Sequence, residues 1–244
     1  MKIYMKNGRL YISPKSWEII MESIINEEIM DGNNLDNDKR SKFVKNFYLP
    51  GLDKIDKVGK CAAKKAADFI TNLTSKSVNI GIISVVLITP YEIKKELKDE
   101  DKIFTGIDFS GDIEGVGVLI FSEESALKLS KSMLAEMGMD DGSDDNVLDD
   151  MKISAIKETC NLIISAYVDT LANFMNTSLT MSPPFFIKGS EKEIIEKLFK
   201  DHHTDDNDII LTFNSELHSQ GIGSGFEVLI IMPPESLNTL FQRL

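Results

Sequence analysis

Two long stretches of the chain repeat apolar residues at the spacing of an amphipathic helix. In residues 153–174 the apolar positions recur three and four residues apart, so that they form one stripe along a helix. Residues 52–73 have a similar pattern. Each stretch is therefore predicted to be a long helix with one face in a core and the other in solvent. The stripe of the later helix consists of Ala155, Ile156, Leu162, Ile163, Ala166 and Leu171.

Shorter apolar runs after these helices predict strands. Residues 81–88 and 116–121 are rich in β-branched side chains, which favour extended structure. A similar run at 228–231 is followed, like the run at 116–121, by a Glu-Ser pair. Both runs are expected to lead into closing helices at 123–137 and 234–244, because acidic first turns suit a helix N-terminus.

A separate segment precedes this pattern. Residues 2–12 are typical of a hairpin with Asn-Gly at its turn. A Ser-Pro pair then supplies a cap and a first-turn proline for an amphipathic helix. We therefore expect an N-terminal extension at 1–45, which either covers a sheet edge or hydrophobic face or tethers a partner protein.

The rest of the chain aligns with itself. Residues 52–73 match residues 153–174 without a gap, at a constant offset of 101 residues (153 − 52). A long helix, two strand blocks and a closing helix are then predicted twice. We predict a first repeat at 46–144 and a second at 145–244, joined by an acidic, turn-rich stretch.

The second long helix carries one constellation of candidate functional residues. Ser154, Glu158 and Asn161 share one helix face because they are four and three residues apart. Pro184 follows Asn161 after twenty-two intervening residues. A carboxylate beside a carboxamide can hold a cation or orient a water molecule, and it can equally be part of an ordinary solvated face.

This spacing resembles the second signature of the CheC family. That signature is Asp or Ser, three residues, Glu, two residues, Asn, twenty-two residues and Pro, and the four residues above meet each fixed position. CheC and its relatives CheX and FliY dephosphorylate the chemotaxis response regulator CheY. The resemblance implies an α+β fold, a CheC-like pseudo-twofold duplicated domain with long signature helices packed on a largely antiparallel sheet. It also implies a hydrolase that acts on the aspartyl phosphate of CheY.

The resemblance further implies a role for each signature residue. The CheY receiver would bring Mg²⁺ and a lysine, so that no cofactor is expected in this chain. Because positioning dominates phosphoryl transfer, Asn161 would hold the attacking water in line with the phosphorus. Glu158 would form an ion pair with the receiver lysine, whereas Ser154 and Pro184 would be structural.

The first copy of the signature is altered. Lys57 and Lys60 replace the acid and the amide, Asp53 matches the serine, and Ile83 matches the proline. An ammonium group has donors and no acceptor, so it cannot orient a water in the same way. We predict two lysines on a solvated helix face and an inactive first site, with a rebuilt docking surface as the alternative.

Composition argues against some classes of partner and favours one cellular compartment. The formal net charge of −12 argues against a nucleic acid or an anionic membrane as a partner. The chain shows no signal peptide, and its longest apolar runs are too short to span a membrane, so a cytoplasmic location is expected. We expect Cys61 and Cys160 to be buried small hydrophobes, and the pair His202 and His203 to lie in a solvated loop.

A non-catalytic interaction module is the competing function. Such a module would bind CheY-phosphate or CheD, the receptor-modifying deamidase that CheC proteins also bind. CheC proteins that pair with CheD tend to carry an acid shortly after the signature proline, and residues 185–189 contain none, which argues against CheD. The sequence also has no counterpart of the FliN domain that FliY carries at its C-terminus, so a motor-switch component is not expected.

Overall fold

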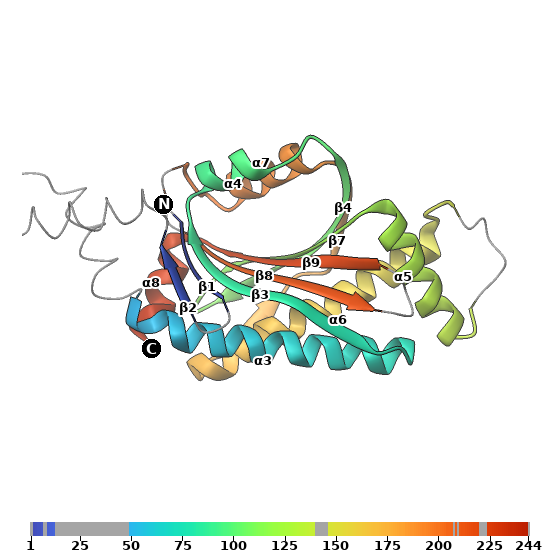
Figure 1. Ribbon diagram of the computed structural model, residues 1–244, viewed down its shortest axis with the longest axis horizontal. Coiled ribbons are helices and arrows are strands. Elements are labelled where there is room, and N and C mark those ends of the chain that lie inside the picture. Colours follow the sequence, from blue (N-terminus) through green and yellow to red (C-terminus); the bar gives the residue numbers. More distant parts are fainter. Residues whose placement is uncertain are drawn as a thin grey trace, which may run out of the picture.

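The structure is a computed structural model that describes residues 2–6, 9–12, 49–139, 146–206, 208, 210–219 and 224–243. One curved sheet lies between two groups of helices (Figure 1). Two long helices cover one face of the sheet, and two short helices cover the other. This arrangement leaves one side of each long helix facing solvent.

All the strand pairs of the described residues are antiparallel and belong to a single sheet. Its order is β2-β1-β3-β8-β9-β5-β4-β6, and β7 also pairs with β4. The strands are β1 (Lys2–Lys6), β2 (Arg9–Ile12), β3 (Val78–Ile88), β4 (Asp101–Gly111), β5 (Gly115–Phe121), β6 (Leu179–Met181), β7 (Phe185–Ser190), β8 (Ile210–Ser219) and β9 (Ser224–Met232).

The helices form distinct layers around this sheet. Helices α3 and α6 pack side by side on one face and run in opposite directions, whereas α4 and α7 lie on the other face (Figure 1). Helices α5 and α8 lie at opposite ends of the molecule. The described helices are α3 (Leu49–Thr74), α4 (Pro90–Glu96), α5 (Glu123–Glu136), α6 (Asp150–Met175), α7 (Glu191–Asp201) and α8 (Pro234–Gln242).

The order of elements occurs twice along the chain. A long helix, a strand, a short helix, two strands and a closing helix run from α3 to α5, and the same series runs from α6 to α8 with the short β6 added. The first strand of each series pairs with the hairpin of the other, because β3 pairs with β8 and β7 pairs with β4. The central strands β5 and β9 pair with each other. Each half therefore completes the sheet of the other half.

The sheet separates two hydrophobic cores. The larger core lies under the long helices and includes Ile55, Ile163 and Ile230. The smaller core lies under α4 and α7 and includes Phe104 and Phe199. Removal of these side chains from water is the main favourable contribution to folding, so both faces of the sheet contribute to stability.

The predicted α+β class, with long helices on an antiparallel sheet, is confirmed. The predicted order of elements lacked α4 and α7, although both have sequence signals. Thr89 caps α4 by accepting a hydrogen bond from the backbone N–H of Glu92 at 3.4 Å. Helix α7 buries a stripe of apolar residues, which is the helical spacing that the sequence shows: Ile194, Ile195, Leu198 and Phe199.

The structure describes only part of the predicted N-terminal segment. Strands β1 and β2 pair as a hairpin with Ile3 opposite Ile12, and β1 also pairs with β3. The Asn-Gly turn and the helix expected after it lie outside the described residues. The division of the chain at residues 45 and 144 stays a prediction.

Candidate functional site

Hydrogen bonds fix both ends of α6. At its start, the Asp149 carboxylate accepts a hydrogen bond from the Lys152 backbone N–H at 2.9 Å, which caps the helix. The Lys152 side chain is 2% exposed and donates to the Val147 carbonyl at 2.9 Å and to Asp149 at 3.1 Å. At its end, Asn176 adopts a left-handed conformation with φ of 52°. The helix that carries the candidate residues therefore has defined ends.

Close contacts of its buried face fix the rotation of α6 about its axis. Ile163 and Ile164 are fully buried. Gly117 of β5 lies against Ile164 so closely that a Cβ at residue 117 would be 2.6 Å from its Cγ2 atom. The Tyr167 hydroxyl donates a hydrogen bond to the Ser215 hydroxyl of β8 at 2.6 Å. These contacts determine which side chains of α6 reach solvent.

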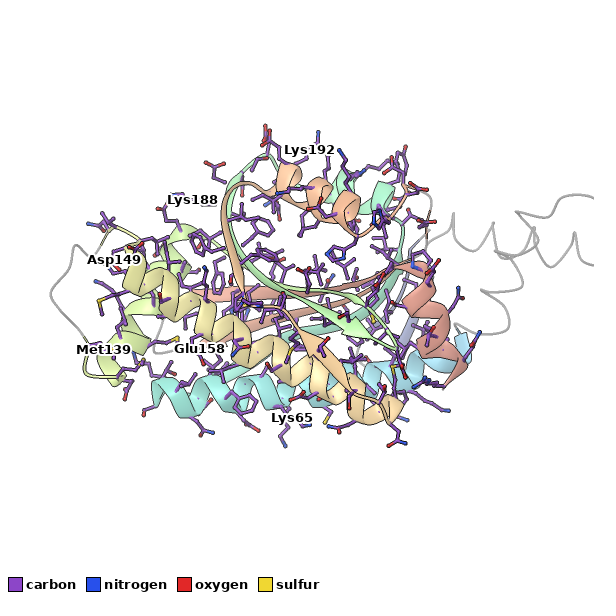
Figure 2. All side chains as sticks on the ribbon, turned by 180° about the vertical axis from the view of Figure 1, so that it is seen from behind. Lys65, Met139, Asp149, Glu158, Lys188 and Lys192 are labelled. Carbon is purple, nitrogen blue, oxygen red and sulfur yellow. The ribbon has the colours of Figure 1, made fainter. Side chains whose placement is uncertain are left out.

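Three of the predicted site residues lie on the outer face of α6. Glu158 is exposed, Asn161 is half-buried, and Figure 2 shows Glu158 on the outside of the helix. Their Cβ atoms are about 5–6 Å apart, as expected for residues three apart on a helix. The exposed Ser154 donates from its hydroxyl to the Asp150 carbonyl at 2.8 Å, a bond within the first turns of the helix. A partner can therefore reach the carboxylate and the carboxamide together.

Pro184 lies between β6 and β7 in a segment that is bonded to β4. The Ser182 backbone N–H donates to the Asp108 carbonyl at 2.9 Å, and the Ser182 hydroxyl accepts from the Asp108 N–H at 3.1 Å. Helix α6 packs against both β6 and β7, and Ser165, one turn after Asn161, contacts β6 through its hydroxyl. The proline therefore belongs to the segment that borders the Asn161 side of α6.

The corresponding face of α3 has a different arrangement. Lys57 is exposed, whereas Lys60 folds back by one turn onto the carboxylate of Asp56, at 2.5 Å. The Asp56 side chain is 3% exposed, so the Lys60 ammonium compensates a buried negative charge. Lys60, predicted to lie on a solvated helix face, has a side chain that is 41% exposed and is also ion-paired. The side chains of Asp53 and Ile83 lie outside the described residues.

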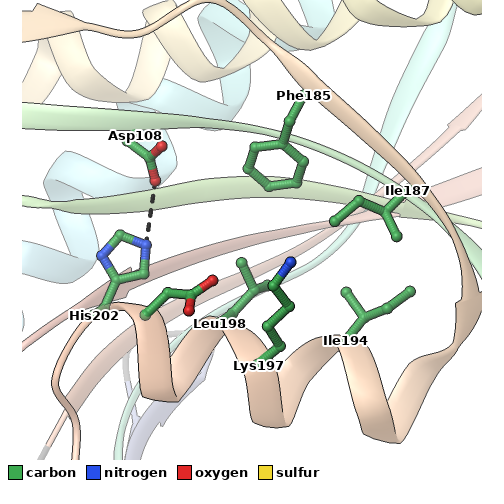
Figure 3. Close-up of a pocket in the computed structure, with 8 residues that line it drawn as sticks. Asp108, Phe185, Ile187, Ile194, Lys197, Leu198 and His202 are labelled. Atoms are coloured by element: carbon green, nitrogen blue, oxygen red, sulfur yellow. Dashed lines mark ion pairs between the residues drawn. The ribbon is translucent and has the colours of Figure 1, made fainter.

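A second candidate is a pocket of about 440 Å³ on the opposite face of the sheet, between α7 and strands β4 and β7 (Figure 3). Its wall is mixed: Phe185 and Leu198 are among four apolar lining residues, and the other four are charged or polar. At its rim, Nε2 of His202 lies 3.2 Å from the Asp108 carboxylate. This pair joins the end of α7 to β4, the strand whose Asp108 backbone is hydrogen-bonded to Ser182. The prediction of a solvated loop is wrong for His202, whose side chain is 18% exposed at the end of a helix.

The two cysteines differ in burial. The described part of the chain was also searched for metal-binding clusters and for membrane-spanning helices. Cys61 is exposed, contrary to the prediction, whereas Cys160 is buried, and burial raises the pKa of the Cys160 thiol to about 12. Within the described residues, His, Cys, Asp and Glu form no group of three or more that could hold a metal ion. The same residues include no helix with both the length and the apolar character needed to cross a membrane.

Comparison with known proteins identifies the family. A family model described as chemotaxis phosphatase CheX matches residues 103–214, which include α6 and Pro184. CheC1 of Halobacterium salinarum, named as a candidate CheY-P phosphatase, is 22% identical over 170 residues, covering 69% of this chain and 83% of that relative. These matches support a place for the chain in the CheC/CheX/FliY family. The resemblance drawn from the sequence is thus confirmed, and the CheC/CheX/FliY family is one of chemotaxis phosphatases.

Solved structures of flagellar proteins share the fold. FliY of Thermotoga maritima matches with a TM-score of 0.62 at 14% identity, over 81% of this chain and 98% of that chain. The FliM middle domain of H. pylori matches with a TM-score of 0.58 at 11% identity, over 81% of this chain and 99% of that chain. At these identities the likeness concerns the fold alone, and the same fold occurs in proteins with different names.

Proposed function

We propose that this chain accelerates hydrolysis of the aspartyl phosphate of a CheY-type response regulator. The observation that carries the proposal is the pair of accessible side chains Glu158 and Asn161 on adjacent turns of a helix whose ends and rotation are fixed. A rigid helix loses little conformational freedom when it enters a partner's pocket. The match to a family model of chemotaxis phosphatases supports the same reaction class.

Asn161 positions the attacking water. Hydrolysis forms a bond between the water oxygen and phosphorus and breaks the bond between phosphorus and the aspartate oxygen, which releases inorganic phosphate. The carboxamide oxygen accepts a hydrogen bond from the water and so directs its lone pair toward phosphorus. A neutral amide suits this place, because a carboxylate would be repelled by the phosphoryl oxygens.

Glu158 positions the helix in the receiver. Its carboxylate is exposed and forms an ion pair with the active-site lysine of the receiver. Because Glu158 is one turn before Asn161, that ion pair sets how deeply the amide enters the pocket. The receiver contributes the Mg²⁺ that neutralises the phosphoryl oxygens, so the proposal requires no cofactor in this chain.

The test is the decay of CheY-phosphate prepared with acetyl phosphate. Micromolar wild-type protein should accelerate the decay and should leave free small phosphoesters unchanged. The double variant Glu158→Ala/Asn161→Ala should lose the acceleration. The matched control Asp169→Ala/Asn173→Ala removes the same chemical groups from exposed positions later on α6 and should keep it. Unchanged decay with the wild-type protein would refute the proposed hydrolase.

A non-catalytic receiver-binding module is the second candidate. The observation that favours it is α3, where a helix of the same length carries lysines in place of the acid and the amide. The decay assay separates the two candidates when it is combined with a binding measurement. A module binds CheY that carries beryllofluoride, a phosphoryl mimic, and leaves the lifetime of CheY-phosphate unchanged. CheD is not part of either proposal, because residues 185–189 contain no acid.

A further inference from the structure

Exposed methionines cluster at one end of α6. The three most exposed large apolar side chains among the described residues are Met137 at 56%, Val147 at 52% and Met139 at 49%, and Met151 is 39% exposed. Met137 and Met139 follow α5, whereas Val147 and Met151 flank the start of α6. We call these four residues the methionine patch. Exposed apolar surface of this kind commonly marks an interaction site.

The methionine patch is continuous with the candidate site. Met151 and Glu158 are seven residues apart, which places them on the same face of α6, separated by about 10 Å along the axis. Met137 lies one turn after Met133, whose sulfur contacts the buried hydroxyl of Thr159, so α5 packs against the part of α6 that carries Glu158. Figure 2 shows Met139, Asp149 and Glu158 toward the same end of the molecule.

The area that a typical protein–protein interface buries is large enough to reach from Glu158 to this patch. A stable protein–protein interface buries about 800 Å² on each partner, which corresponds to a circle of roughly 16 Å radius. A partner centred on Glu158 and Asn161 would therefore extend past Met151 and onto the end of α5. A receiver centred on the acid and the amide would therefore cover the methionine patch.

Charge indicates the chemistry of the partner's surface. Glu136 and Asp150 are exposed and directly adjoin Met137 and Met151 in the chain, Glu158 is exposed two turns after Met151, and the whole chain has a net charge of −12. A complementary partner has an apolar centre bordered by basic side chains, because opposite potentials steer association and like charges oppose it. A second copy of this chain would instead bring the same acidic border against the first.

We propose that the methionine patch is the docking surface for the response regulator, which covers it with an apolar surface next to its phosphorylated aspartate. The inference rests on the proposed function and adds the residues that supply affinity. Methionine suits this role because its flexible, polarizable side chain adapts to the partner's shape. The patch contributes to binding, whereas Asn161 contributes to the chemical step.

The test compares two single variants on one helix. Met151→Gln replaces an apolar side chain with a polar one of similar shape. Phe174→Gln introduces the same polar group in place of an exposed apolar side chain at the far end of α6, where Phe174 is 37% exposed. Met151→Gln should weaken binding of beryllofluoride-activated CheY by about fivefold, and the triple variant Met137→Gln/Met139→Gln/Met151→Gln by about tenfold or more. Phe174→Gln should bind as the wild type does.

Kinetics separate this inference from the proposed function. The triple variant should raise KM for CheY-phosphate by about the same factor as Kd and leave kcat within about twofold of wild type. Affinities of patch variants within twofold of wild type, with normal wild-type phosphatase activity, would overturn the docking surface and leave the proposed function intact. A wild-type protein that neither binds activated CheY nor hydrolyses CheY-phosphate would overturn both. A wild-type dimer in sedimentation that the triple variant converts to a monomer would assign the patch to a second copy instead.

Discussion

Helices α3 and α6 share a scaffold and differ in their exposed chemistry. Both contain 26 residues, and both their starts and their ends are offset by 101 residues (150 − 49 and 175 − 74). They pack against each other on the same face of the sheet. Yet α6 presents Glu158 and Asn161 to solvent, whereas Lys60 of α3 is paired with Asp56.

The difference shows which positions of a duplicated helix are free to change. Replacing a buried residue leaves a cavity or strain, so the packed faces of both helices stay mainly apolar. An exposed side chain has no such constraint and can exchange an acid for a lysine at little cost to stability. Because α3 and α6 run in opposite directions, positions 57 and 158 lie toward opposite ends of the helix pair. A change at one site therefore leaves the geometry of the other intact.

The largest expected effect is that of Asn161→Ala. The variant should lower kcat for CheY-phosphate hydrolysis by about 10²-fold or more, because it removes the group that orients the water. Binding of beryllofluoride-activated CheY should change little, since the Glu158 carboxylate remains. Stopped-flow decay of CheY-phosphate and a titration with activated CheY measure the two quantities. Normal kcat in this variant would discard the site on α6.

Glu158→Lys converts position 158 to the residue found at the matching position of α3. The new ammonium faces the receiver lysine, and a like-charge contact at an interface costs about 2 kcal/mol or more, which corresponds to roughly 30-fold in Kd. Asp169→Lys makes the same change of charge at an exposed position three turns later and is the control. Equal losses in both variants would attribute the effect to net charge alone.

Lys60→Ala tests whether α3 has kept its lysine for stability. The change leaves the Asp56 carboxylate buried without its cation, and the expected cost is about 1–2 kcal/mol, because the Lys60 side chain is partly solvated. For a chain of this length the melting temperature should fall by about 2–8 °C. Lys64→Ala, one turn later and exposed, should leave it unchanged. Asp56→Asn in the Lys60→Ala background should restore part of the stability, and no recovery there would argue against a charge effect.

The smallest expected effect is that of Lys57→Ala on catalysis. An ammonium group has no acceptor for a water, so kcat/KM should remain within about twofold of wild type. Lys60→Ala, assayed at a temperature where it is fully folded, should also keep kcat/KM within about twofold of wild type. A loss comparable to that of Asn161→Ala, in a protein with a normal melting temperature, would show that α3 takes part in docking or chemistry.

The sequence alone determined the local structure of both helices and the identity of the candidate residues. Apolar spacing predicted the long helices, and the offsets of four and three placed Ser154, Glu158 and Asn161 on one face. These features depend on neighbouring residues along the chain, so they can be inferred without the fold. The short helices α4 and α7 also had local signals, and a fuller use of capping and spacing would have predicted them.

Only the tertiary structure decided which of these side chains are accessible and what lies beside them. Cys61 and Cys160 each lie within a long amphipathic helix, yet one is exposed and the other buried. His202 pairs with Asp108, which is 94 positions away (202 − 108). Likewise, packing of α5 against α6 brings Met139 toward the end of the molecule where α6 begins. Burial and contacts between distant segments are properties of the packed chain, because each side chain's environment comes from residues that the local sequence does not contain.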